Sequence, residues 1–139
     1  MLVGITILVL GLNLRPAAFE VGVWIGITVV YLLVLFRITL PERSHLIEYS
    51  VVAAFIYEAL IERRSQGRTV PVPALSAIAL AAMVGTVDEL IQYYLPNRHF
   101  DTTDIIFNIL ASVMAVVSIV ILRRTRDTVE MMAQNRKSD

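Results

Sequence analysis

The chain has 139 residues, a net charge of zero, 57% hydrophobic residues and a mean hydropathy of +0.71. Because soluble domains average ~45–50% apolar residues, this composition indicates a membrane protein that lies in a lipid bilayer. Zero net charge argues against a nucleic-acid partner. The lack of cysteine excludes disulfides, thiolate metal sites and a cysteine nucleophile.

The first apolar run covers residues 2–14 and ends at Arg15. No basic region precedes it and no small-residue cleavage site follows it, so we expect a structural segment rather than a cleaved signal peptide. At ~1.5 Å per residue it is shorter than a ~30 Å bilayer core, which leaves open whether it spans. The second run covers residues 17–40 and contains Gly22 and Gly26, a spacing that permits close helix contact.

Three more helices are predicted after Pro41. Ser44 is a candidate N-cap for a third helix from His45 to about residue 63, and Gly67 is a stop signal in the polar loop that follows.

Pro71 and Pro73 suit the first turn of a fourth helix, which runs to about Tyr94. The fifth helix is predicted over residues 103–122, and residues 123–139 form a frayed or surface-lying polar tail. The expected fold is therefore an all-α transmembrane bundle of five helices, or of four if residues 2–14 do not span.

The basic residues predict the orientation of these helices. If the segments alternate, only three arginines lie on one side of the membrane: Arg37, Arg43 and Arg98. The more numerous remaining basic residues mark the cytoplasmic side, which also holds the C-terminus.

Polar residues interrupt the apolar helices near the other, extracytoplasmic side. At ~100° per residue, each of the last three helices has a face that carries small residues within the membrane and polar residues at its outer end. The polar residues of these faces are His45, Glu48 and Tyr49, then Asp88, Glu89 and Gln92, then Asp101, Asp104 and Asn108. Small residues let helices approach, so we expect these ends to form one cluster, with Arg43 and Arg98 at its rim.

These residue types favour acid–base chemistry or the binding of a divalent cation, and His45 and Glu48 could point at one ion. The arginines could hold a phosphate or carboxylate. Each of these polar residues could instead have a purely structural role. Asp101 and Asp104 could form a helix capping box, and the arginines could simply neutralise the acids. Transport is a weaker alternative, because the inner halves of the helices carry mainly alanine and valine.

The motif ERSHLIEY at residues 42–49, the motif DELIQ at residues 88–92, the turn Pro96-Asn97-Arg98, and Asp104 with Asn108 together resemble the VanZ-like family of small bacterial membrane proteins. The resemblance covers about residues 41–115, within a transmembrane domain over residues 1–123 that precedes a cytoplasmic polar tail over 124–139. It implies a multi-pass protein of the bacterial cytoplasmic membrane and cell envelope, with a link to glycopeptide (teicoplanin) resistance in the member that names the family. It names no cofactor, metal or reaction.

We therefore expect a protein that binds or modifies an anionic lipid or lipid-linked envelope precursor at the outer leaflet. The predicted acid–base or ion-binding residues are His45, Glu48, Asp88, Glu89 and Asp104. The predicted ligand contacts are Arg43, Arg98, Gln92, Asp101 and Asn108. The alternative is a non-catalytic accessory subunit of a larger membrane complex, in which these polar residues hold the helices together and Gly22 and Gly26 mark the partner surface.

Overall fold

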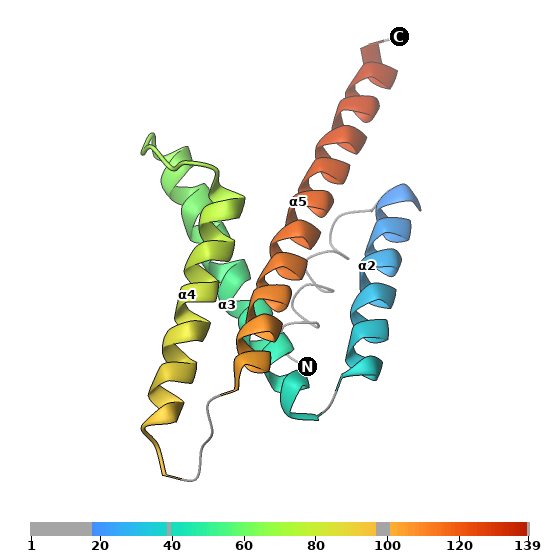
Figure 1. The fold of residues 1–139 in the computed structure, drawn as a ribbon. Coiled ribbons are helices and arrows are strands. Elements are labelled where there is room, and N and C mark those ends of the chain that lie inside the picture. The colour runs from blue at the N-terminus through green and yellow to red at the C-terminus, as the bar shows by residue number, and fades with distance from the viewer. Residues whose placement is uncertain (1–17, 39, 97–100, 139) are drawn as a thin grey trace. The chain divides into compact units, whose positions relative to one another are not determined.

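A computed structural model describes residues 18–38, 40–96 and 101–138. The secondary structure of these residues is entirely helical (Figure 1), which confirms the predicted all-α class. The helices are α2 (Ala18–Arg37), α3 (Leu40–Ser65), α4 (Pro73–Tyr93) and α5 (Thr102–Ser138).

Four helices in the described part of the chain are long and apolar enough to cross a membrane. The alternative count of four is therefore confirmed and the count of five is not supported, since the apolar segment 2–14 lies outside the described residues. At ~1.5 Å per residue, the 20 residues of α2 match a bilayer core of ~30 Å. The 37 residues of α5 exceed that thickness, so α5 must extend beyond the hydrocarbon.

The chain divides into two units, of which one comprises residues 35–120. The other contains most of α2 and the part of α5 from Ile121 onward. No residue of α2 is buried, and large side chains such as Leu33 and Phe36 are exposed on it. An apolar helix that buries none of its residues within the described chain suits contact with lipid.

Within the 35–120 unit, α3 and α4 lie side by side and antiparallel (Figure 1). Gly67 ends α3, as predicted, with a positive φ of 79°. The Arg68 N–H donates to the Arg63 carbonyl and the Gly67 N–H to the Arg64 carbonyl, the two bonds of a Schellman motif. The chain then turns into α4, which has Pro73 in its first turn.

Three predicted helix boundaries are wrong. The helix α3 begins at Leu40, so Ser44 lies inside it and is not an N-cap. A proline in the first turn loses no intrahelical hydrogen bond, and Pro41 is therefore compatible with an earlier start. Pro71 precedes α4 instead of belonging to its first turn.

The third error concerns the end of α5, which continues to Ser138 instead of ending near residue 122. The polar segment is rich in residues with good helix propensity, and Arg126 Nε donates to Glu130 Oε1 at 3.2 Å across one turn. These features let the helix continue after its apolar part ends.

The core of the 35–120 unit consists mainly of small side chains. Its buried members are Ala53 and Tyr57 of α3, Ala77 and Ala81 of α4, and Ala115 and Val116 of α5. Small residues let helix backbones approach closely, and in lipid such packing replaces the hydrophobic effect as a cause of helix association.

Gly85 of α4 is the tightest point of this packing. A Cβ atom built on Gly85 would lie 2.9 Å from Asn108 Cβ, 2.7 Å from Asn108 Nδ2 and 3.0 Å from Tyr49 Cε1. A side chain at this position would therefore push α4 away from a residue of α5 and a residue of α3 together.

We expect Gly85→Ala, and more strongly Gly85→Leu, to lower the melting temperature of the purified protein in detergent. Overpacking of a close contact costs ~1–3 kcal/mol. Gly26→Ala in α2 is the matched control, because a Cβ there meets no described atom within 4 Å. Normal accumulation and melting of Gly85→Leu would show that this face of α4 does not pack inward.

Candidate functional site

Polar residues of three helices meet at one end of the 35–120 unit. The start of α3, the end of α4 and the start of α5 contribute them. The helices α3 and α4 are antiparallel (Figure 1), and α5 follows α4 closely in sequence. We call this group the polar cluster. Its members are His45, Tyr49, Asp88, Glu89, Gln92, Asp104 and Asn108.

His45 connects α3 to α5 through both nitrogens of its ring. Its Nδ1 lies 3.1 Å from Asn108 Oδ1, and its Nε2 lies 3.5 Å from Asp104 Oδ2. The ring also stacks on Tyr49, with centroids 6.1 Å apart and planes inclined by 7°. These three contacts fix the orientation of the imidazole.

Asp88 connects α4 to α3. Its Oδ2 accepts a hydrogen bond from the Tyr49 hydroxyl at 3.2 Å and another from Gln92 Nε2 at 3.1 Å. The carboxylate therefore has two neutral donors. Hydrogen bonds to a charged group are among the stronger ones in proteins, so Asp88 is well satisfied without a cation.

Glu89 is completely buried, with 0% of its surface exposed. Its carboxylate accepts from Gln92 Nε2 at 3.4 Å and from the Asp101 backbone N–H at 3.5 Å. Both contacts are long for hydrogen bonds, which are most common near ~2.9–3.0 Å for N–H donors. Glu89 is therefore a buried carboxylate with weak compensation, an arrangement that is costly without a proton or a cation.

Asp101 caps α5, as the structural interpretation of the sequence suggested. Its Oδ1 accepts from the Thr103 backbone N–H at 2.7 Å, and this hydrogen bond lowers the pKa of the exposed Asp101 carboxyl. Asp104 faces His45, and the Asp101 N–H donates to Glu89. The backbone at the start of α5 is thus tied to the polar cluster.

The cluster contains more acids than bases. Asp88, Glu89 and Asp104 lie in it, and in the described part of the chain no lysine or arginine forms an ion pair with any of them. Among the described residues, the basic side chain in contact with these acids is that of His45, which carries a charge only when it is protonated. One oxygen each from Glu89 and Asp104 and one nitrogen from His45 lie within 4.8 Å of one another, so these three residues could hold a metal ion.

Arg43 lies at the same end of α3 but outside these contacts. At ~100° per residue, Arg43 and His45 flank the buried face that carries Leu46 and Tyr49. The Nε atom of Arg43 is buried and has no hydrogen-bond partner among the residues that the structure describes. A buried donor without an acceptor is unusual in folded proteins.

The structure thus brings together six of the ten predicted site residues: His45, Asp88, Glu89, Gln92, Asp104 and Asn108. Asp101 touches the cluster through its backbone. Glu48 is exposed on α3 and is not part of the converging metal-ligand group, whereas Arg98 lies outside the described residues.

Two residues that were not among the predicted site residues prove to be central. Tyr49 provides a hydroxyl donor to Asp88 and a surface for the His45 ring, and Gly85 provides the space that Asn108 occupies. Both residues lie on the predicted inward faces of the third and fourth helices, and this position was the sequence signal that could have identified them.

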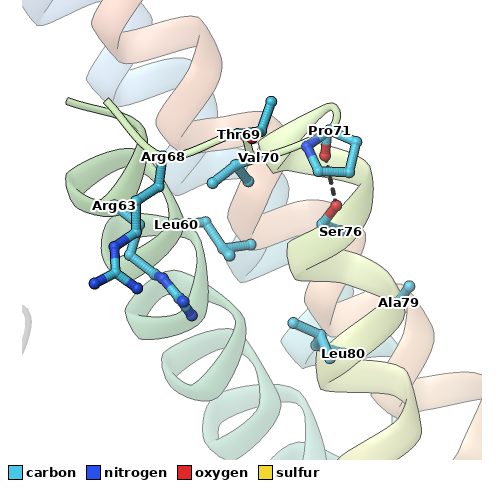
Figure 2. A pocket seen from close by; sticks show the side chains of 9 residues that line it. All are labelled: Leu60, Arg63, Arg68, Thr69, Val70, Pro71, Ser76, Ala79 and Leu80. Carbon is cyan, nitrogen blue, oxygen red and sulfur yellow. Dashed lines mark hydrogen bonds between the residues drawn. The ribbon is translucent and has the colours of Figure 1, made fainter. Parts of the chain in front are cut away.

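A hollow of about 450 Å³ lies at the opposite end of α3 and α4 (Figure 2). Arg63, Arg68 and Leu60 line one side of it, and the Ser76 hydroxyl donates to the Pro71 carbonyl at 2.7 Å on the other. No residue of the polar cluster lines the hollow. Its arginines belong to the basic end that the sequence predicts to be cytoplasmic, so the hollow and the cluster are separate features.

A sequence model of the VanZ/LLP1 family matches residues 25–123. No curated protein and no solved structure matches the chain significantly. The matched region contains α3, α4 and the apolar part of α5, and with them the whole polar cluster.

We expect Glu89→Gln to leave the melting temperature in detergent unchanged or higher, because it removes a weakly compensated buried charge. Asp88→Asn should lower the free energy of unfolding by about 1 kcal/mol, because its two donors would then meet a neutral acceptor. The pair is matched, since both changes keep the shape of the side chain. A loss of ~3–5 kcal/mol in Glu89→Gln would instead indicate a closed structural network, in which a partner charge is left uncompensated.

Proposed function

The chain belongs to the VanZ/LLP1 family, and we propose that it binds an anionic lipid or lipid-linked envelope precursor at the outer leaflet of the bacterial cytoplasmic membrane. The ligand would lie at the end of the 35–120 unit that holds Arg43 and the polar cluster. Arg43 would contact the anionic group. Gln92 and Asn108 would orient the acidic side chains and the imidazole.

The buried, unpartnered Nε of Arg43 is the observation that supports this proposal best. A guanidinium group presents donors in a planar fork that matches the oxygens of phosphate and carboxylate. Leaving such a donor unpaired in a buried position costs ~1–3 kcal/mol or more. An anionic ligand would supply the acceptor that the described protein residues do not provide.

The distribution of basic residues supports the outer leaflet. Arg63 and Arg64 lie in the last turn of α3, Arg123 and Arg124 lie inside α5, and both pairs are remote in sequence from the polar cluster. Because basic residues are enriched on the cytoplasmic side, the cluster is expected on the outer side.

The same ligand class would account for a link to glycopeptide (teicoplanin) resistance, which the family resemblance implies. The susceptibility of cells that carry or lack the protein provides the cellular readout. His45, Glu89 and Asp104 are close enough together to support acid–base chemistry on a bound ligand.

The accessory-subunit alternative has one observation in its favour. The helix α2 buries no residue, and a Cβ built on Gly22 or Gly26 meets no described atom within 4 Å. A partner helix would fit against these glycines. Stoichiometric copurification of another protein from native membranes, lost in Gly26→Leu and unaffected by Arg43→Gln, would favour this alternative.

Binding of a short-chain phosphatidylglycerol to the purified protein in neutral detergent tests the proposed ligand, with phosphatidylcholine as the neutral comparison. We expect Arg43→Gln to weaken phosphatidylglycerol binding at least ~10-fold, a loss of ~1.4 kcal/mol. Arg68→Gln, in the hollow at the other end, is the matched control. Equal binding of the two lipids, or a loss confined to Arg68→Gln, would contradict the proposal.

Reporter fusions test the orientation. Fusions after Gln66 and at the C-terminus should report the cytoplasm. A fusion after Asn97 should report the outside, because α4 lies between Gln66 and Asn97 in the sequence. If Gln66 and Asn97 reported the same side, α4 would not span the membrane.

A further inference from the structure

We propose that His45, Glu89 and Asp104 form a binding site for one divalent transition-metal ion. Each residue comes from a different helix, so the site would form only when α3, α4 and α5 are packed together. The proposal does not depend on the anionic ligand, because none of its three residues is the proposed anion contact.

The spacing of the donor atoms fits a metal ion. The three atoms lie within 4.8 Å of one another, and His45 Nε2 is 3.5 Å from Asp104 Oδ2. Two ligands that each lie ~2.0–2.1 Å from a tetrahedral zinc ion are ~3.4 Å apart. The His45–Asp104 edge therefore has about the length that two ligands of one ion adopt, and a small movement of Glu89 would complete the set.

The His45 ring is oriented as a metal ligand would be. Asn108 Oδ1 lies 3.1 Å from Nδ1 and can only accept, so this contact is a hydrogen bond in the tautomer that carries its proton on Nδ1. In that tautomer Nε2 carries the lone pair, and it lies 3.5 Å from Asp104 Oδ2. Histidine ligands of metal ions commonly donate their other ring N–H to a carbonyl or carboxylate, and this contact fixes their tautomer.

The uncompensated negative charge of the cluster also favours a bound cation. With Nδ1 carrying the proton of a neutral ring, the Nε2 lone pair and the Asp104 carboxylate repel each other across 3.5 Å. Glu89 is fully buried and has only long hydrogen bonds. A cation between the three residues would remove both costs at once. The alternative to a bound cation is a second proton on His45, which would give the ring a positive charge.

The donor types indicate which ion is favoured. One imidazole and two carboxylates suit Zn²⁺, Mn²⁺, Co²⁺ or Fe²⁺ better than Mg²⁺, which prefers oxygen ligands alone. Three protein ligands leave at least one position open, as in zinc sites that bind water or substrate.

The full chain, purified in detergent with an affinity tag that contains no histidine and stripped with a chelator, provides the test. Co²⁺ is the probe, because its visible absorption reports the coordinating atoms. We expect about one Co²⁺ per chain, displaced by Zn²⁺ and not by Mg²⁺. Absence of stoichiometric binding by the unmodified protein would overturn the proposal, whatever the behaviour of any variant.

The variants Glu89→Gln and Asp104→Asn should each weaken Co²⁺ binding at least ~100-fold, since removing even an outer contact of a metal site costs ~10–100-fold. They should also abolish the rise in melting temperature that the ion causes in the unmodified protein. Glu48→Gln is the matched control, an exposed acid one turn from His45, and should bind Co²⁺ normally. Unchanged binding in both site variants, or a loss in Glu48→Gln, would show that the ion lies elsewhere.

Discussion

The close approach at Gly85 is the constraint on which the polar end of this protein depends. Only a residue without a side chain lets α4 come near both Tyr49 of α3 and Asn108 of α5. That approach brings Asp88 within reach of the Tyr49 hydroxyl and Glu89 within reach of the backbone that starts α5. The alanine core deeper in the unit continues the same close packing, so helix association and the assembly of the polar cluster have one physical cause.

The cluster is not electrically balanced by the described protein residues. Asp88 is satisfied by neutral donors, whereas Glu89 and Asp104 face an imidazole and have no lysine or arginine partner within the described part of the chain. At the same end, Arg43 has a buried donor without an acceptor. Natural sites often keep such unfavourable groups because a ligand compensates them. A cation between the acids and an anion at Arg43 would each remove one of these two costs.

The sequence predicted the helices, their inward faces and most of the residues that meet in the polar cluster, because small residues followed by polar ones on one helical face indicate a polar contact between helices. It missed the start of α3, since Pro41 is as compatible with beginning a helix as with breaking one. It placed Glu48 in the predicted site because Glu48 follows His45 by three residues. Which of two neighbouring positions points inward depends on how α3 is rotated against α4, and no pattern within α3 determines that rotation. The hydrogen bond from Tyr49 to Asp88 depends on the same packing.

The protonation state of His45 tests most directly whether the cluster is a ligand site or a closed ion network. The chain has only two histidines, so nitrogen NMR of protein labelled at histidine, with His99→Gln for assignment, resolves both ring nitrogens of His45. With Zn²⁺ present we expect a proton on Nδ1 and none on Nε2, which would be bound to the ion. Protons on both nitrogens, unchanged by Zn²⁺, would mean that His45 neutralises the acids by itself and would contradict the proposed site.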